Sequence, residues 1–267
     1  MKNNFLKKLL RRFKTLTDQD IDKLNYNQYA QSLISRPIES YRLGLKAVPF
    51  NQQKVFEKYY DAAIMHIAPD YRILELGAGV GVHTGILASR IRGGELYIND
   101  ISEISLDVNK KLHPSVNTLC SSMKSINLPS DSVDIVFSCG SLSYEDPETV
   151  DREIKRLLKS NGKLIVLDTL NHNPIYRINR LVRYVLGNRT LNSVKRIPNI
   201  YRITNLSKDF ELVSLTYYGS YLWLIKIMSL LVGKNKANTL NDILEERWPS
   251  QINAFKFVLI CTGYKKV

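Results

Sequence analysis

The feature that most constrains the fold is a glycine-rich stretch at residues 73–81, which contains the run Glu-Leu-Gly-Ala-Gly-Val-Gly. The apolar run from Tyr71 to Leu76 is typical of a short buried strand, and a helical pattern opens at Val82. Three glycines stand between them because a tight turn that approaches a ligand closely leaves no room for a Cβ. A strand, a glycine turn and a helix in this order predict a cofactor site.

The spacing of the glycines narrows the type of cofactor. A dinucleotide fingerprint, G-x-G-x-x-G, requires a glycine where this chain has Val82, and the third glycine is Gly81 instead. The pattern is E-x-G-x-G-x-G, with Glu75 two residues before Gly77. A second strand-like run ends at Asp100, 19 residues past Gly81.

These residues resemble motif I of the class I S-adenosylmethionine-dependent methyltransferases, and the chain looks like a methyltransferase of type 11. The resemblance implies S-adenosylmethionine as the cofactor and Asp100 as its ribose contact. It also implies that the glycine turn lies under the methionine part of the cofactor. The turn's assigned contacts are Glu75, Gly77, Ala78, Gly79 and Gly81.

Two further cofactor contacts are predicted beyond motif I. The segment 121–134 resembles the family segment in which an acid meets the adenine ring, but Ser121 or Ser122 stands in the place of the acid. We assign the contact to Ser122. Cys139 lies near the end of the fourth predicted strand, where open α/β sheets bind their ligands.

Strands and helices alternate along the chain, which favours a doubly wound sheet. We expect an α/β fold with a Rossmann-like, seven-stranded, mostly parallel sheet and helices on both faces. The resemblance implies that the last strand is antiparallel beside the fifth and that a helix at 51–67 covers the cofactor. Residues 1–49 form a helical basic extension, and residues 50–267 form the methyltransferase domain with helical insertions around 171–208 and 220–250.

The net charge of +13 is concentrated in two segments without acidic residues. Residues 1–14 carry six basic side chains and residues 169–208 carry eight. Such segments imply an anionic partner, which is a lipid headgroup, a phosphorylated substrate or nucleic acid. The pattern at residues 1–16 is that of a basic amphipathic helix, which either lies on an anionic membrane or packs on its own domain.

Residues 221–232 are apolar almost all round but too short to span a bilayer, so they form a core helix, a lid or a membrane contact.

The candidate catalytic residue is His172, just past the fifth predicted strand, because an imidazole can accept the proton of a hydroxyl acceptor near neutral pH. The alternative is that His172 caps the next helix.

Arg177 and Arg180 of that helix are candidate ligands for a phosphate or diphosphate, and the alternative is a solvated helix face. Apolar residues on one side of this helix are expected to hold it on the body: Ile178, Leu181, Val182 and Val185. No cluster has metal-ligand spacing, so no metal is expected.

We therefore expect a methyltransferase that O-methylates a small anionic, lipid-linked or glycan acceptor near a membrane, as in polysaccharide biosynthesis. Three cysteines without C-x-x-C spacing favour a reducing compartment, so we expect a cytoplasmic protein that can lie at the inner face of the membrane. An RNA methyltransferase and a non-catalytic cofactor-binding partner remain alternatives. Nucleic acid is less favoured because the fourth strand ends in Ser138-Cys139-Gly140-Ser141, which is not an Asn/Asp-Pro-Pro-aromatic motif.

Overall fold

The computed structural model describes residues 16–263 except 35, 38–40, 42, 50–51, 187–188 and 249. The amphipathic helix predicted for residues 1–16 therefore lies, except for Leu16, outside the described residues. Among the described residues, no helix is both long enough and apolar enough to cross a membrane.

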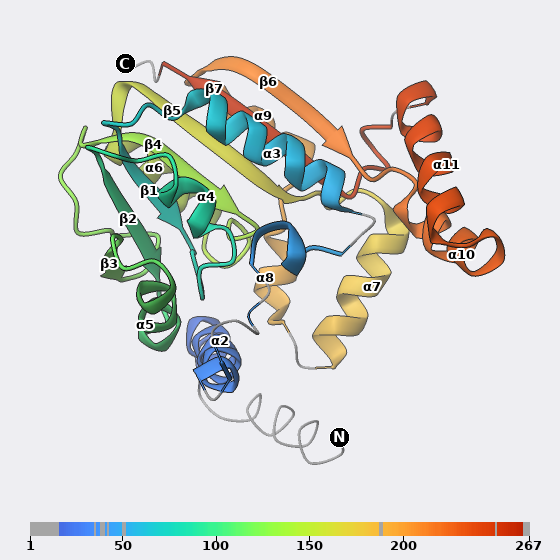
Figure 1. The fold of residues 1–267 in the computed structure, drawn as a ribbon, viewed down its shortest axis with the longest axis horizontal. Helices are drawn as coiled ribbons and strands as arrows, with labels where there is room; N and C mark the ends of the chain where they lie inside the picture. Colours follow the sequence, from blue (N-terminus) through green and yellow to red (C-terminus); the bar gives the residue numbers. More distant parts are fainter. Residues whose placement is uncertain are drawn as a thin grey trace.

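The core of the molecule is a seven-stranded sheet in the order β3-β2-β1-β4-β5-β7-β6 (Figure 1). Six of the strands run parallel, and β7 is antiparallel to both of its neighbours, β5 and β6. The predicted fold class and the predicted place of the last strand are confirmed. The strands are β1 (Arg72–Leu76), β2 (Glu95–Asp100), β3 (Asn117–Cys120), β4 (Val133–Cys139), β5 (Leu158–Thr169), β6 (Glu211–Tyr218) and β7 (Lys256–Thr262).

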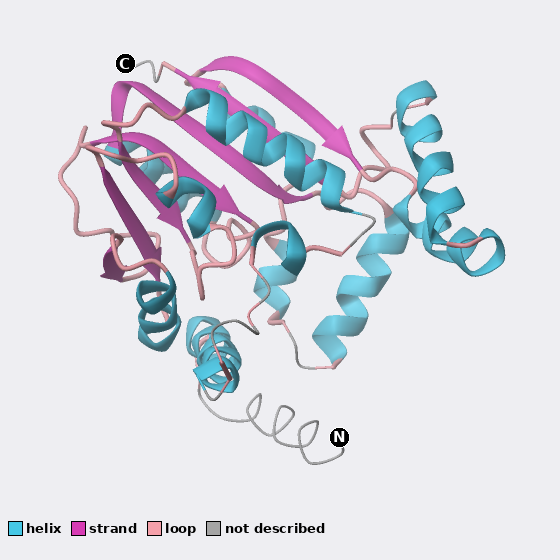
Figure 2. Cartoon of the chain, in the orientation of Figure 1, coloured by secondary structure: helices cyan, strands magenta, loops and turns pink. Residues whose placement is uncertain are grey.

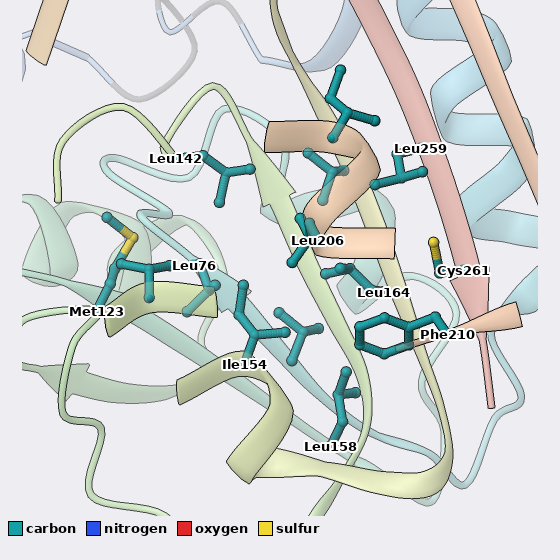
Figure 3. Close-up of a cluster of buried hydrophobic side chains, with 14 of the residues drawn as sticks. Leu76, Met123, Leu142, Ile154, Leu158, Leu164, Leu206, Phe210, Leu259 and Cys261 are labelled. Carbon is teal, nitrogen blue, oxygen red and sulfur yellow. The ribbon is translucent and has the colours of Figure 1, made fainter. Parts of the chain in front are cut away.

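Helices cover both faces of the sheet (Figure 2), because its central strands are apolar on both sides. One apolar cluster joins the sheet to α6 and α9 and includes Ile154, Leu206 and Phe210 (Figure 3). The other joins it to α3, α4 and α5 and includes Tyr59 and Phe137. The helices are α2 (Asp18–Ile34), η2 (Gly44–Ala47), α3 (Gln53–His66), α4 (Thr84–Ala88), α5 (Glu103–Leu112), α6 (Pro147–Leu157), α7 (Pro174–Val185), α8 (Leu191–Lys195), α9 (Ile200–Ser207), α10 (Leu222–Val232) and α11 (Lys234–Arg247).

The boundary between α6 and β5 differs from what the local sequence pattern predicts. Glu148 to Lys159 has the spacing of a helix and Asn161-Gly162 is a typical stop signal, but α6 ends at Leu157 and β5 begins at Leu158. Leu158 pairs with Val133 of β4 and is fully buried. Sheet pairing and burial outweigh the local helical pattern there.

The orientation predicted for α7 is wrong. The apolar side chains expected to pack on the body are exposed, with Ile178 at 64% and Leu181 at 52%. The helix instead buries Tyr176, whose hydroxyl donates to the carbonyl of Gly219, and Arg180. The Arg180 Nη1 donates to the Leu170 carbonyl at 2.9 Å, so the polar ends of long side chains, and not the aliphatic ones, find partners in the body.

A buried ion pair fixes α9 against α6. Arg202 donates to the Leu142 carbonyl at 2.7 Å and to Asp151 at 3.0 Å, and its side chain is 9% exposed.

We expect Arg202→Met to lower the free energy of unfolding by about 3–5 kcal/mol, because it leaves the Asp151 carboxylate largely buried without its partner. Urea denaturation measures this loss. Arg152→Met, at an exposed position of α6, is the matched control and should change stability by only about 0.5 kcal/mol; an equal effect of both substitutions would contradict the account.

Candidate functional site

The glycine loop between β1 and α4 has the backbone conformation that the sequence predicted. Gly77, Gly79 and Gly81 have φ values of +61°, +53° and +86°, a region that L side chains rarely adopt. A Cβ on Gly77 would lie 2.5 Å from the Ser141 Cβ, and one on Gly81 would lie 2.6 Å from the Asn109 Oδ1. A Cβ on Gly79 would meet nothing within 4 Å, so this glycine faces open space.

A buried network beneath the loop holds it in this shape. The Thr84 hydroxyl donates to the Glu75 carboxylate at 2.6 Å, and the Asn109 Nδ2 donates to the Thr84 hydroxyl at 3.0 Å and to the Gly79 carbonyl at 3.3 Å. Burial raises the pKa of Glu75 to about 7, while the bond from Thr84 opposes that rise. Glu75 therefore supports the loop from below.

Asp100, at the end of β2, clamps the loop from the side. One carboxylate oxygen accepts the Gly79 N–H at 2.9 Å and the other accepts the Ser102 N–H at 2.9 Å. Asp100 is 8% exposed, and burial raises its pKa although these backbone bonds act in the opposite direction. The neighbouring Asn99 Oδ1 is buried and has no hydrogen-bond partner among the described residues.

The loop and Asp100 form part of the wall of a pocket at the carboxyl ends of β1, β2 and β4. α2 forms another wall, and the Tyr26 hydroxyl donates to the Tyr144 hydroxyl at 2.5 Å with the two rings edge to face. The pocket is lined by Gln19, Asp22, Tyr26, Tyr29, Gly77, Ala78, Gly79, Val80, Val82, His83, Asn99, Asp100, Ile101, Met123, Cys139, Gly140, Ser141, Tyr144 and Glu145. Most of its walls are apolar, and the polar groups converge on a few points, which is typical of a site for a small molecule.

The helix that closes the pocket is α2, and the expectation that the helix at 51–67 covers it is wrong. α3, which spans that segment, lines a different cavity together with β6 and α11. α2 is held in place by Asn27, whose Oδ1 accepts a hydrogen bond from the Ser102 hydroxyl at 2.6 Å, and by its packing on α5. The predicted N-terminal extension is thus part of the site.

The structure brings together some of the predicted cofactor contacts and separates others. Gly77, Ala78, Gly79, Asp100 and Cys139 line the pocket, whereas Glu75, Gly81 and Ser122 lie behind its walls. The Ser122 hydroxyl donates to the carboxylate of Glu145 at 2.6 Å. In this region Met123 and Glu145 line the pocket instead, and no motif in the sequence indicates either residue.

The predicted catalytic residue and the predicted substrate-binding residues do not line the pocket. His172 does not line the pocket, and its Nε2 accepts the N–H of Ile200, the first residue of α9. Asn173, and not His172, caps α7 by accepting the Ile175 N–H. Arg177 is exposed, while Arg180 is 6% exposed and its Nη2 is buried without a hydrogen-bond partner among the described residues.

Three titratable groups of the pocket are shifted toward their neutral forms. Asp22 is 4% exposed, and burial raises its pKa to about 7. Burial lowers the pKa of His83 to about 4, and its Nδ1 lies 2.5 Å from the Tyr60 hydroxyl. Burial also raises the pKa of Cys139 to about 12, so at neutral pH this side chain is a thiol and not a nucleophilic thiolate. No group of three or more metal-ligating side chains is found in the described part of the chain.

Comparison with known proteins agrees with this geometry. Residues 74–166 match the model of the methyltransferase domain family. Phosphoethanolamine N-methyltransferase 1 of Triticum aestivum is 26% identical over 167 residues, which are 58% of this chain and 31% of that protein. An uncharacterized methyltransferase-like protein of Schizosaccharomyces pombe is 40% identical over 93 residues, 34% of this chain and 36% of that protein. The chain thus spans only about a third of the length of these curated relatives.

Solved structures share the whole fold at low sequence identity. Geranyl diphosphate C-methyltransferase from Streptomyces coelicolor A3(2), in complex with Mg²⁺, geranyl diphosphate and S-adenosyl-L-homocysteine, has a TM-score of 0.60 and 13% identity. The likeness covers 91% of this chain and 98% of that one. The [4+2]-cyclase SpnF has a TM-score of 0.58 and 15% identity, with 94% and 97% coverage, so the fold alone does not decide the reaction.

Residues 74–166 match the methyltransferase domain family, and the seven-stranded sheet and glycine loop that surround this segment have the fold of the class I S-adenosylmethionine-dependent methyltransferases.

The residues present fit S-adenosylmethionine. Gly79 leaves open space above the loop, Asp100 keeps free lone pairs for ribose hydroxyls, and the orphaned Asn99 Oδ1 offers a further acceptor. Met123 supplies an apolar wall of the kind that packs against an adenine ring.

The Asp100 carboxylate provides the sharpest test of cofactor binding. We expect Asp100→Ala to weaken binding of S-adenosylmethionine by about 1–3 kcal/mol, because a buried charged acceptor and its clamp on Gly79 are lost. Isothermal titration calorimetry measures the affinity. Asp107→Ala removes the same charge from an exposed position of α5 and should leave the affinity unchanged; a loss of similar size in both variants would mean that net charge, and not this contact, sets the affinity.

Proposed function

We propose that this chain is an S-adenosylmethionine-dependent methyltransferase that O-methylates a small anionic acceptor, lipid-linked or glycan, near a membrane. The observation that carries the proposal is the pocket in which the glycine loop and Asp100 meet under α2. When bound, S-adenosylmethionine supplies an electrophilic methyl group on a sulfonium. The protein's contribution is then orientation, exclusion of water and removal of a proton from the acceptor.

Two arginines, each with a buried nitrogen that has no hydrogen-bond partner among the described residues, support an anionic acceptor. The Arg189 guanidinium lies 5.4 Å from the ring centroid of Tyr144, a pocket residue, and its Nη1 is buried without a hydrogen-bond partner among the described residues. Arg180 has a buried, unpartnered Nη2 as well. Free guanidinium N–H groups suit the oxygens of a phosphate or carboxylate. Two related proteins are named for acceptors of this kind, phosphoethanolamine and geranyl diphosphate.

The general base is the second part of the proposal. His172 remains the base predicted from the sequence, although its Nε2 is engaged with the backbone of α9. Asp22 is better placed, because its carboxylate lies in the pocket wall and its pKa is close to neutral. In a methyl transfer to a hydroxyl group, the Asp22 carboxylate would take the proton that the acceptor loses.

The pH dependence of turnover separates the two candidate bases. A base works in its deprotonated form, so we expect kcat/KM to rise with pH through about 7, the raised pKa of Asp22, and then to level off. Asp18, Glu145, Arg189 and Arg196 surround Asp22 and contribute to its pKa. Asp22→Asn should abolish the rising limb and lower turnover by about 10²–10⁴ with cofactor affinity retained.

The matched experiment is His172→Ala. If this substitution, and not Asp22→Asn, removes the rising limb, then His172 is the base and the assignment to Asp22 is wrong.

The two arginines predicted for substrate binding serve as a matched pair. Arg177 and Arg180 lie three residues apart on α7, the first exposed and the second buried. We expect Arg180→Gln to raise the KM for an anionic acceptor by about tenfold or more, because a charged hydrogen bond is lost, and to leave cofactor affinity unchanged. Arg177→Gln should change neither constant. An unchanged KM in Arg180→Gln would refute a role for this arginine in acceptor binding.

The acceptor class itself can be read from the destination of a labelled methyl group. Purified protein with methyl-labelled S-adenosylmethionine is incubated with separated lipid, glycan and RNA fractions from cells lacking the gene. Label in a base-labile or ether-linked methyl group of the lipid or glycan fraction supports the proposal. Label in RNA favours the alternative of an RNA methyltransferase, and label in none with intact cofactor binding favours a non-catalytic partner.

Residues 1–16 carry the proposal of membrane proximity. Their six cations and apolar residues at helical spacing suit an anionic lipid surface. A cytoplasmic enzyme recruited in this way would meet lipid-linked acceptors at the inner face of the membrane.

A further inference from the structure

The outward face of α7 is apolar. The helix buries Tyr176 and Arg180 on one side. At about 100° per residue, Ile178, Val182 and Val185 lie nearly opposite that buried side. Their side chains are 64%, 49% and 54% exposed. An amphipathic helix normally packs its apolar face on the core, whereas α7 exposes its apolar face and packs the opposite face on the protein.

α10 adds a second set of exposed apolar side chains at the same end of the molecule (Figure 1). It buries only Leu222 and Ile225, whereas Leu230 and Leu231 are 85% and 76% exposed. The Tyr176 hydroxyl, in the first turn of α7, donates to the Gly219 carbonyl just before α10, which ties the start of α7 to the start of α10. We name as the α7–α10 surface the exposed residues Ile175, Ile178, Leu181, Val182, Val185 and Leu186 with Ile227, Leu230, Leu231 and Val232.

Exposed cations accompany this surface. Arg177 and Arg183 lie on either side of the apolar face of α7, and Lys226, Lys234 and Lys236 lie on α10 and α11. No carboxylate among the described residues forms an ion pair with any of these five side chains. The whole segment 169–208 contains no acidic residue. Exposed apolar side chains on two helices that are joined at their first turns, with cations around them, have the composition of an interfacial membrane element.

The charges also decide between the occupants that an apolar surface can have. In a two-fold dimer each patch would face its own copy, and Arg177 and Arg183 would meet like charges. An anionic bilayer accepts the apolar side chains below its headgroups and pairs the cations with lipid phosphates. We propose that the α7–α10 surface docks this protein on an anionic membrane, in addition to any contact made by residues 1–16.

The position of α7 gives this docking a consequence for the site. α7 follows β5 after four residues, at the edge of the sheet where the carboxyl ends of β1, β2 and β4 meet the pocket. Docking would bring that edge to the lipid surface, which, given the proposed function, favours an acceptor anchored in the membrane.

Vesicle co-sedimentation tests the docking without any need for methyl transfer. The full chain and a chain lacking residues 1–16 are each mixed with phosphatidylcholine vesicles, with or without phosphatidylglycerol. The variant carries Leu181→Gln, Val185→Gln, Leu230→Gln and Leu231→Gln, because glutamine keeps the helices and removes only apolar contact. The control carries Met65→Gln and Leu212→Gln, two exposed apolar positions at the end of α3 and the start of β6, outside the α7–α10 surface.

We expect the variant to lose binding to anionic vesicles by about tenfold or more in both chains, with the control unchanged and added salt weakening all binding. Unaltered cofactor affinity shows that the variant is folded and that the methyltransferase assignment stands by itself. Equal binding of variant and control would overturn the proposal, as would complete loss of binding on deletion of residues 1–16 alone. Conversion of a dimer into a monomer by the variant, seen by light scattering with no vesicle binding, would assign the surface to a second copy of the chain.

Discussion

The structure of the site depends on the carboxylate of Asp100. Its two oxygens accept the backbone N–H groups of Gly79 and Ser102, and so tie the glycine loop to the end of β2 and to the start of α5. A loop with three left-handed glycines has a large conformational entropy to lose, and these bonds, with the Glu75–Thr84–Asn109 network below, hold it in one shape. Because these bonds hold the loop in one shape, the pocket is already formed before a ligand binds.

The region around α7 contains buried arginine side chains that are only partly paired. Arg180, Arg189 and Arg202 all extend into the protein, and each keeps at least one buried nitrogen without a partner among the described residues. Burying cations without full compensation is costly, so such groups suggest a ligand that completes the pairing. Arg202 is bound to Asp151, whereas Arg180 and Arg189 are the two arginines that we propose to bind an anionic acceptor.

Short-range patterns in the sequence predicted the alternating strands and helices, and a buried run followed by Gly77, Gly79 and Gly81 predicted the tight turn. The place of the last strand beside the fifth and the assignment of Asp100 came from the resemblance to the methyltransferases. The wall built by α2 could not be predicted, because nothing local in a polar helix tells that Tyr26 meets Tyr144 or that Asn27 meets Ser102. The orientation of α7 was predicted wrongly for a related reason: periodicity locates an apolar face but does not say whether the core or another surface receives it.

If the cofactor binds between the glycine loop and α2, hydrogen–deuterium exchange measured with and without S-adenosylhomocysteine will detect it in both segments. We expect slower exchange on binding in residues 77–81, around Asp100 and along α2, with α11 unchanged as an internal reference. Binding without protection in α2, or with protection confined to the cavity between α3, β6 and α11, would contradict it.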